Sequence, residues 1–593
     1  MDDYDYIIIG AGIGGLVLAN RLSQDPSLNV LLIEAGANRM GDPRIETPGF
    51  LATMYGNPDF DWDYMSVPQV HVKNRQIGQP RGRVVGGSSA LNFSAVMYPT
   101  ASNFDTWKAL GNDGWGAEDI FPIFGNSTPE LLGTSRYMKI DNQGCDGPVP
   151  VSLPDVYGPF NKAWNETFAE LGWETDADPL DGHKLGAFTC PLSVDAKTGR
   201  RGYAAAYYSP DVAARPNLRL LAETTVERII FSQQERDVIA TGVQIKTQDV
   251  SHEIKAKKEV ILCAGSLNSP QLLELSGIGR ADLLQTHGIP VIVDNPAVGE
   301  NLQDHSITSI NFEIADGQVS GDIMRDPNVV QALIKLYEET CGGPLAGMPL
   351  SMAYLPLMDG SGAVPKEEID TLLSKYLDND NTTANLQAQY SHVRKMLLQS
   401  DDASSHYLFL PAQLHMNPGK TTLTDVLAKT LPENYISIMM LHNHPFSRGS
   451  VHISSGKSED KPIYDPNLLS HPLDVEIMAR QMQFAERIAE TAPFSALLKA
   501  GKRMPESTTD LSDLEHAKDV VKDRLYTCFH PAGSCAMLPR EIGGVVDSEL
   551  KVYGTKNLRV VDASVFPLEP SGNIQATVYA VAERAADLIN ARS

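Results

Sequence analysis

One segment near the C-terminus combines residue types that could take a proton from a substrate. His530 follows the apolar pair Cys528-Phe529 and precedes Pro531, so its backbone is predicted to be extended rather than helical. Imidazole titrates near neutral pH and can therefore accept the proton of an alcohol hydroxyl. Because the chain has 14 histidines, composition alone selects none of them. The setting of His530 makes it the candidate base.

The N-terminal segment has the pattern of a strand, a helix and a second strand. An apolar run over 6–9 ends at a glycine-rich turn, helical spacing follows over 16–22, and a second apolar run over 30–33 ends at Glu34. Short apolar runs of this kind are typical of buried parallel strands. The segment therefore predicts a unit that binds a dinucleotide.

The glycines of the turn follow GxGxxG spacing, and each has a physical role. Gly10 allows the tight turn, Gly12 lets the backbone approach a pyrophosphate, and Gly15 allows the helix and strand to pack closely. The helix N-terminus offers N–H donors to the phosphates. Glu34 can accept hydrogen bonds from a ribose diol and disfavours a 2′-phosphate, which leaves NAD and FAD as candidates.

Further segments carry a resemblance to a known family. The loop 82–92 contains Gly-Gly-Ser-Ser-x-x-Asn, the segment 265–279 follows an apolar run, and His-Pro-x-Gly-Ser-Cys-x-Met spans 530–537. With 298–305 and 444–449, these segments resemble the glucose-methanol-choline (GMC) oxidoreductases, FAD-dependent flavoproteins, and in particular their fungal aryl-alcohol and glucose oxidase-like members. The resemblance extends from residue 4 to about residue 590 and implies FAD as the cofactor.

The resemblance implies oxidation of an alcohol to a carbonyl by hydride transfer to flavin N5, with His530 as general base. The family pairs this histidine with a second His or Asn, and that position here is Asn573. An amide can orient the substrate hydroxyl but cannot be the base, so His530 would be the titrating member of the pair. Asn573 can also be interpreted as the N-cap of the final helix, and the two roles are compatible.

The resemblance also implies which residues contact FAD. Val226 would contact adenine through its backbone, and Asp562 would accept from backbone N–H groups rather than touch phosphate. The final helix would point its N-terminus at the flavin and stabilise negative charge there by up to ~2 kcal/mol. Noncovalent attachment is expected, since Ala90 and Leu91 stand in the loop where some members carry the histidine that binds FAD. The predicted cofactor-binding residues are Gly10, Gly12, Ile13, Gly14, Gly15, Glu34, Ala35, Arg83, Val85, Gly86, Ser88, Asn92, Val226, Asp562, Ala563, Asn573 and Ile574.

One stretch departs from the family pattern. After Asn92 the family usually continues towards an aromatic residue and an Arg-Gly pair, whereas residues 93–100 here read Phe-Ser-Ala-Val-Met-Tyr-Pro-Thr. The departure keeps open an alternative, a non-redox cyclase or dehydratase that retains FAD structurally and uses His530 as acid or base. A pure binding protein is a third alternative, against which His530 and Asn573 beside a complete cofactor site speak.

The dispersed motifs predict an α/β fold in two interleaved parts. A Rossmann-like FAD-binding domain of the GMC/PHBH type would comprise residues 1–150, 215–310 and 525–593. An α+β substrate-binding domain built on an antiparallel sheet would comprise residues 151–214 and 311–524.

Local patterns assign several elements within these parts. Residues 437–441 and 450–453 are predicted to be strands of an antiparallel sheet. Helical stretches within 320–405 are interpreted as helices that cover the site. Pro270 suits the first turn of a helix that ends before Gly277.

Charge and composition disfavour several classes of partner. The 49 Lys and Arg residues against 74 Asp and Glu residues give a formal charge of −25, which argues against nucleic acid and anionic membranes. The FAD phosphates must then be held locally, by helix N-termini and backbone amides. The six cysteines are scattered without zinc-ligand spacing, so neither a disulfide framework nor a metal is expected. The expected partners are a small-molecule alcohol and molecular oxygen or another electron acceptor.

The N-terminus is acidic and has no basic n-region, and no apolar run is long enough to span a bilayer. We therefore expect a cytoplasmic protein with a role in secondary metabolism, or a secreted one if a leader was removed. The sequence favours neither an oxidase nor a dehydrogenase.

Overall fold

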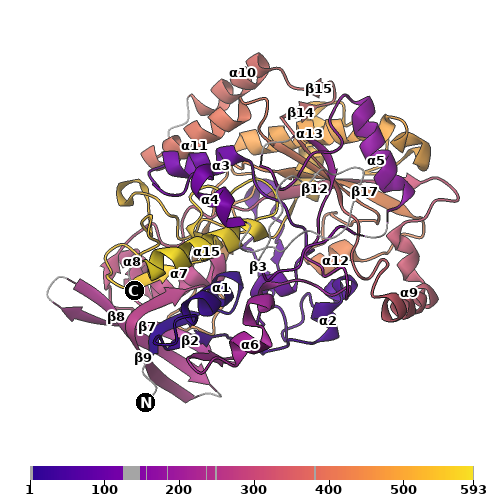
Figure 1. Ribbon diagram of the computed structural model, residues 1–593. Coiled ribbons are helices and arrows are strands. Elements are labelled where there is room, and N and C mark those ends of the chain that lie inside the picture. Colours follow the sequence, from indigo (N-terminus) through magenta and orange to yellow (C-terminus); the bar gives the residue numbers. More distant parts are fainter. Residues whose placement is uncertain are drawn as a thin grey trace.

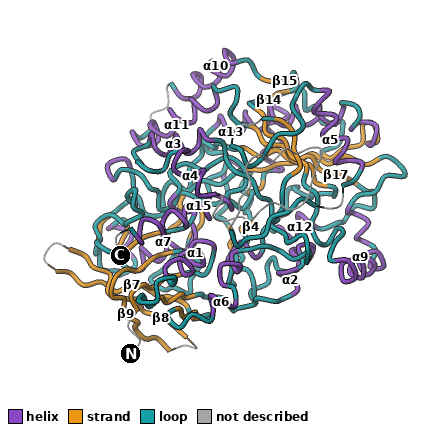
Figure 2. Tube along the Cα trace, viewed as in Figure 1, coloured by secondary structure: helices purple, strands orange, loops and turns teal. Residues whose placement is uncertain are grey.

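Two large β-sheets organise the chain, one at each end of the molecule (Figure 1). The computed structural model describes residues 4–124, 147–154, 157–182, 185–234, 237–247, 250–378 and 382–591. Strands gather in two separate regions, and helices and loops fill the space between and around them (Figure 2). Each sheet is seven-stranded, and the site described below lies between the two.

The first sheet is Rossmann-like. Its parallel strands β1 and β2 form from the apolar runs predicted at 6–9 and 30–33, and both are buried. The parallel part is ordered β6 (Leu218–Leu221), β2 (Val30–Ile33), β1 (Tyr4–Ile9), β9 (Val250–Leu262) and β22 (Leu558–Val560). The structure therefore confirms the predicted parallel sheet behind the glycine-rich turn.

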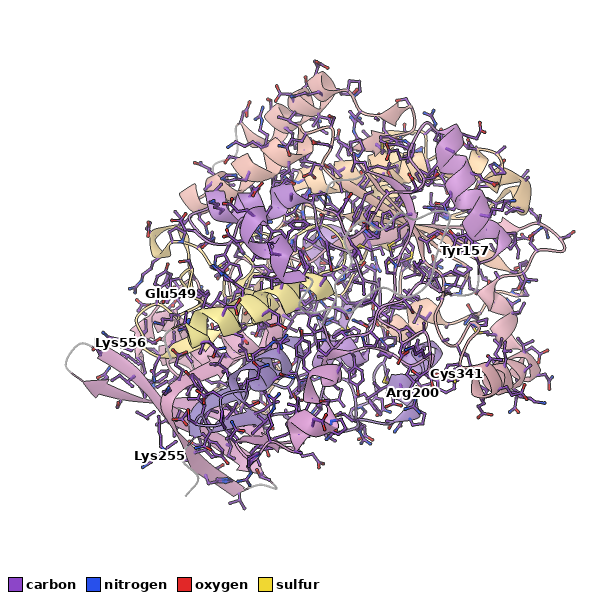
Figure 3. All side chains as sticks on the ribbon, viewed as in Figure 1. Tyr157, Arg200, Lys255, Cys341, Glu549 and Lys556 are labelled. Carbon is purple, nitrogen blue, oxygen red and sulfur yellow. The ribbon has the colours of Figure 1, made fainter. Side chains whose placement is uncertain are left out.

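An antiparallel extension lengthens this sheet beyond β9, with the start of β7 at the cavity described below. The strands β7 (Thr225–Gln234) and β8 (Asp237–Thr247) pair in antiparallel fashion, and β8 pairs with the first half of β9. Exposed lysines such as Lys255 and Lys556 lie at this periphery (Figure 3). Neither lysine is part of the described lining of the cavity.

The helices around the first sheet are largely buried and are formed by segments that carry the sequence motifs. The helix α1 (Ile13–Leu22) packs against α15 (Gln575–Asn590), and α7 (Gly265–Leu275) packs against β7. The prediction that Pro270 occupies a first helical turn is wrong, because α7 begins at Gly265 and Pro270 lies inside it. The carbonyl of Ser266, which an amide at position 270 would otherwise bind, accepts a 2.6 Å hydrogen bond from Ser534 Oγ. A side chain thus replaces the N–H that proline lacks.

The second sheet is antiparallel, as predicted for the substrate-binding part. The predicted strand at 437–441 forms the centre of β17, whereas the strand at 450–453 forms β18 (Ser450–His452), which pairs with β19 (Ile463–Asp465) in a separate two-stranded sheet. The main order is β20 (Leu498–Met504), β12 (Ser306–Ile314), β17 (Tyr435–His442), β16 (Ser405–Leu410), β13 (Ser351–Leu355) and β5 (Gly186–Thr189), with β21 (Tyr526–Thr527) paired to β12.

Helices pack around the second sheet. The long helix α13 (Pro472–Glu490) packs against β17 and β12, and α10 packs against α11 and α13 (Figure 1). The predicted helices within 320–405 form α9 (Pro327–Thr340), α10 (Lys366–Leu377) and α11 (Ala384–Leu397). Further helices among the described residues are α2 (Pro43–Glu46), α3 (Ala101–Ala109), α4 (Ala117–Phe124), α5 (Pro159–Glu170), α6 (Pro210–Ala213), α8 (Ala281–Thr286), α12 (Leu423–Leu427) and α14 (Leu514–Arg524).

Membrane-spanning helices and disulfides were both unexpected from the sequence. No helix within them is long and apolar enough to cross a membrane. The five cysteines among them are free, while Cys145 lies outside the described ranges.

The packing of α1 on β1 yields a stability prediction. A Cβ on Gly15 would lie 1.9 Å from the carbonyl oxygen of Gly10, which is backbone and cannot move aside. We expect Gly15→Ala to lower the free energy of unfolding by about 1–3 kcal/mol or more, measured by urea denaturation. The matched control is Gly360→Ala, where the new Cβ makes only a 3.5 Å contact with Gln483. Equal stability of the two variants would contradict the close packing.

Candidate active site

A single cavity runs from the glycine-rich turn of the first sheet to the face of the second. Its lining includes Gly10 and Glu34 at one end, His530 and Asn573, and strand residues of the second sheet such as Met352. Among the described residues that line it, none comes from α9, α10 or α11, so the interpretation of those helices as the cover of the site is wrong. The short helix α12 lines the cavity instead.

Most of the predicted site residues meet at this cavity. The residues predicted from sequence that line it are Gly10, Gly12, Ile13, Gly14, Glu34, Ala35, Ser88, Asn92, Val226, His530, Asp562, Ala563, Asn573 and Ile574. Four predicted residues, Gly15, Arg83, Val85 and Gly86, are not part of the lining.

Those four residues shape the site from behind. Gly15 packs against the backbone of β1, as described above. Val85 is fully buried, and the amide of Gly86 donates a 2.8 Å hydrogen bond to the carbonyl of Ala11 in the glycine-rich turn. The guanidinium of Arg83 lies over the ring of Trp62, 4.9 Å from its centre. They therefore hold the loop against the turn rather than face the cavity.

The first turn of α1 fits a phosphate-bearing cofactor. The helix has no capping side chain and no acidic residue in its first turn, so its first N–H groups are open to an anion. A Cβ on Gly12 would meet Gly87 Cα only at 4.0 Å, which leaves the backbone here open to the cavity. Both features match the pyrophosphate role assigned to the turn.

The Glu34 carboxylate is held in place by backbone. It accepts 2.8 Å hydrogen bonds from the amides of Ala11 and Gly36, and burial raises its pKa to about 7. Each carboxylate oxygen can accept a further hydrogen bond. The arrangement fits the predicted acceptance of ribose hydroxyls at the end of β2.

The carboxylate of Asp562 accepts hydrogen bonds from backbone N–H groups, as predicted. Its carboxylate accepts hydrogen bonds from the amide of Gly265 at 2.9 Å, the hydroxyl of Ser269 at 2.6 Å and the amide of Ser564 at 2.8 Å. It therefore caps the start of α7 and joins this helix to the strand β22.

His530 and Asn573 are in contact where the two parts of the chain meet. The amide nitrogen Nδ2 of Asn573 lies 3.2 Å from Nε2 of His530. The alternative interpretation of Asn573 as the helix N-cap is wrong, because the N-cap of α15 is Ile574. The side chain of Asn573 is therefore directed at the imidazole instead of the helix backbone.

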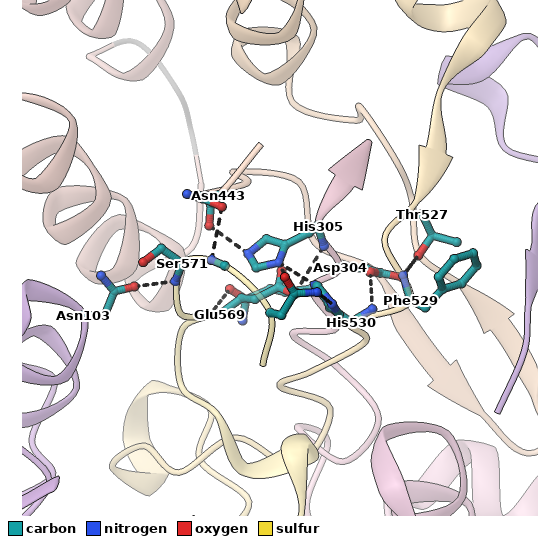
Figure 4. A network of polar contacts seen from close by, with 12 residues as sticks. Asn103, Asp304, His305, Asn443, Thr527, Phe529, His530, Glu569 and Ser571 are labelled. Atoms are coloured by element: carbon teal, nitrogen blue, oxygen red, sulfur yellow. Dashed lines mark hydrogen bonds and ion pairs between the residues drawn. The ribbon is translucent and has the colours of Figure 1, made fainter. Parts of the chain in front are cut away.

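A second histidine lies behind His530. Nδ1 of His305 is 2.9 Å from Nδ1 of His530 (Figure 4). The register of β12 with β21 favours this contact, because Ser306 pairs with Thr527. His305 directly precedes β12 and His530 follows soon after β21, so both histidines lie at the same end of the strand pair. The imidazoles meet edge to face at 82°.

The partners of His305 determine which nitrogen carries each proton. Burial lowers the pKa of His305 well below its usual value and that of His530 to about 3, so both rings are neutral near pH 7. Nε2 of His305 lies 3.1 Å from the carbonyl oxygen of Asn443, which can only accept, so this nitrogen carries the proton. Nδ1 of His305 must then accept from Nδ1–H of His530. The lone pair of His530 is consequently on Nε2, beside Asn573.

A buried glutamate completes the cluster. Glu569 Oε1 lies 3.4 Å from Nδ1 of His305, and both side chains are fully buried. Burial raises the pKa of Glu569 well above its usual value. His305, His530 and Glu569 are close enough to share a metal ion. However, the Nδ1 atoms of the two histidines are already hydrogen-bonded to each other.

The backbone that carries His530 is tightly held. Phe529 has a positive φ of 64°, a conformation that is costly without support. The Thr527 hydroxyl accepts from the amide of Phe529 at 2.8 Å, and Asp304 accepts from the amide of His530 at 3.0 Å. Arg81 donates to the carbonyl of Phe529 at 2.7 Å. These bonds fix the direction in which the imidazole points.

Several of these residues were missed in the sequence. His305 and Asp304 stood in a segment noted only for its resemblance, and Glu569 and Asn443 gave no local signal. The hydrogen bonds that His305 and Asp304 make with His530 span 225 and 226 residues of sequence and arise only through the tertiary fold. The pairing of β12 with β21 was the missing information.

Comparisons with known proteins match the whole chain. Family models described as GMC oxidoreductase match residues 4–307 and residues 445–582. The dehydrogenase mpl7 of Monascus purpureus is 34% identical over 606 aligned residues, which cover 99% of this chain and 96% of the relative.

Solved structures give the same result. An FAD-dependent oxidoreductase from Chaetomium thermophilum superposes with a TM-score of 0.87 at 28% identity, and a fungal aryl-alcohol oxidase with a TM-score of 0.83 at 27% identity. Each match covers 99% of both chains. The predicted α/β fold with a Rossmann-like FAD-binding part is confirmed, and GMC oxidoreductases bind FAD. The chain belongs to the GMC oxidoreductase family.

Proposed function

We propose that the protein oxidises an alcohol to a carbonyl compound, with His530 as the general base. The observation that carries this proposal is the hydrogen-bond chain from Asn443 through His305 to His530, which leaves the lone pair of His530 on Nε2 at the cavity, where it accepts from Nδ2 of Asn573 until a substrate hydroxyl takes that place. A base with this geometry can accept a proton in its neutral form at pH 7.

The residues divide the reaction between them. The substrate hydroxyl would accept a hydrogen bond from Nδ2 of Asn573 and donate its proton to Nε2 of His530. When bound, FAD supplies the acceptor, at N5, for the hydride that leaves the carbinol carbon. The alcohol thus loses one proton and one hydride, hence two electrons, and becomes the carbonyl product. The two neighbouring groups hold the hydroxyl in one orientation.

The cofactor and domain assignments belong to the same proposal. Gly12, Ile13 and Gly14 would hold the phosphates, Glu34 the ribose, and Ile574 at the start of α15 the flavin. Noncovalent binding is supported by the loop, where Ala90 and Leu91 are both buried and carry no nucleophile. We expect molecular oxygen or another compound as the final electron acceptor.

The proposed division of the chain assigns most strands of each sheet to one domain, although β12 begins and β21 lies within the FAD-binding segments. Residues 1–150, 215–310 and 525–593 would form the FAD-binding domain, since the strands of the first sheet come from these segments. Residues 151–214 and 311–524 would form the substrate-binding domain. A place in secondary metabolism stays a prediction.

Removal of the base tests the proposal. We expect the His530→Ala variant to bind FAD as the parent protein does. Anaerobic reduction of its flavin by a substrate alcohol should slow by about 10²–10⁴-fold. Bleaching of the flavin absorbance reports the rate. His252→Ala, at an exposed position on β9, is the matched control. Unchanged reduction in His530→Ala would exclude the role, and turnover without any redox change would favour a cyclase or dehydratase.

The pH profile tests the environment of the base. Burial and the nearby Arg81 lower the pKa of His530 to about 3, and the proton-accepting form is lost only as the pH falls through this value. We therefore expect kcat/KM for flavin reduction to persist below pH 6.5, the ordinary value, and to decline further into the acid range. Stopped-flow reduction over this range measures it. An acid limb at or above 6.5 would contradict the expected environment.

The role of His305 in positioning His530 can be separated from folding. His305→Ala removes the acceptor that keeps the proton on Nδ1 of His530, and we expect reduction to slow by about 10²-fold with FAD content unchanged. In His305→Gln the side-chain carbonyl can accept the same hydrogen bond, so a larger part of the rate should return. Equal rates in wild type and His305→Ala would refute the positioning role.

A further inference from the structure

The part of the cavity that belongs to the second sheet has a composition of its own. Its lining is dominated by large aliphatic and thioether side chains, and most of them are buried, with 9% exposure or less. Six of them are Met352, Leu408, Leu410, Leu423, Val426 and Met439. We call this set the apolar half of the cavity.

The sheet register explains why these side chains share one surface. Met352 on β13 pairs with Leu408 on β16, and Leu408 pairs with Met439 on β17. Residues directly opposite in an antiparallel sheet point to the same face, so the three side chains form a continuous row across three strands. Leu410 continues the face two residues further along β16. Helix α12 adds Leu423 and Val426 from the side.

Charged groups do not reach this half. Among the described residues that line the cavity, those from β12, β13, β16, β17 and α12 are all uncharged. Arg81 also lines the cavity, but its guanidinium donates to the carbonyls of Pro80 at 2.5 Å and Phe529 at 2.7 Å. It is therefore committed to the backbone that supports His530.

The tyrosines of the lining also offer little to a polar substrate. The hydroxyl of Tyr55 donates to the carbonyl of Leu91, and that of Tyr526 donates to the carbonyl of Thr421, both at 2.8 Å. Their aromatic rings are what remains for the cavity. Polar recognition is consequently concentrated at His530 and Asn573.

We propose that the substrate is an uncharged alcohol whose remaining part is a hydrocarbon chain or ring that occupies the apolar half. This inference rests on the proposed function, since it places the hydroxyl between His530 and Asn573. A polyhydroxylated sugar would leave its hydroxyls without partners here, which is costly for buried polar groups. Among the described residues of the apolar half, none offers a carboxylate to a quaternary ammonium alcohol or a cation to a small anion.

A binding series tests the substrate class independently of the chemistry. The His530→Ala holoenzyme, which is not expected to reduce its flavin, is titrated with straight-chain primary alcohols from propanol to octanol, and the perturbation of the oxidised flavin spectrum gives Kd. Each added methylene that leaves water should lower Kd by about fourfold. Choline and glucose should bind more weakly than hexanol. A Kd independent of chain length, or tighter binding of choline or glucose, would overturn the inference.

Kinetics with the wild-type holoenzyme separate this inference from the proposed function. We expect kcat/KM for anaerobic reduction to rise along the same alcohol series. If the alcohols bind in the series but none reduces the flavin, the proposed oxidation fails and the ligand class stands. If choline or glucose reduces the flavin with the highest kcat/KM, the oxidation stands and the substrate class fails.

A matched pair of variants tests the position of the hydrocarbon. Met439→Gln keeps the length of the side chain but places an amide in the row, and we expect about tenfold weaker octanol binding with little effect on propanol. Met439→Leu keeps the apolar surface and should bind octanol within about threefold of the parent. Identical octanol Kd values in the two variants would place the chain elsewhere and overturn the assignment of the apolar half.

Discussion

The hydrogen bond between Nδ1 of His305 and Nδ1 of His530 is the interaction on which the site depends. Its direction is set by the next hydrogen bond along the chain. There the carbonyl of Asn443 can only accept, so the proton of His305 must be on Nε2. Every further assignment follows from this choice of tautomer. Only with the proton on Nδ1 does His530 present a lone pair to the cavity and to Asn573.

The same contact lies at the end of a strand pair of the second sheet. His305 precedes β12, which belongs to the second sheet, and His530 follows β21, which pairs with β12. Asn573 stands at the start of α15, which packs on α1 of the first sheet. The base therefore lies where backbone N–H groups suited to phosphates give way to an apolar surface. In the proposed oxidation, this position would let one cavity hold the charged cofactor and the hydrocarbon part of the substrate.

The sequence predicted the elements formed by local patterns and the residues carried by motifs. The strands β1 and β2 and the turn between them were accessible because short-range spacing encodes them, and the pair His530–Asn573 came from the resemblance to the family. Pro270 was placed wrongly, since the hydroxyl of Ser534 that compensates for it lies far away in sequence. His305 and Glu569 were missed for the same reason. Their roles arise from strand register, and register is a property of the folded sheet.

The helices within 320–405 show a further limit of local patterns. Their helical periodicity was sound, but periodicity shows which face of a helix is apolar and does not show what that face packs against. The cavity is covered by α12 and by the face of the second sheet instead. That face became visible only when β13, β16 and β17 were aligned, with Met352, Leu408 and Met439 in one row.

Neutron diffraction from crystals of the holoenzyme locates the exchangeable protons of both imidazoles. It therefore tests directly which ring nitrogen of His530 carries the proton. We expect nuclear density for deuterium on Nδ1 of His530 and on Nε2 of His305, with none on Nε2 of His530. Deuterium on Nε2 of His530 in the resting enzyme would contradict the account, because the nitrogen that faces the cavity would then be a donor and could not accept the substrate proton.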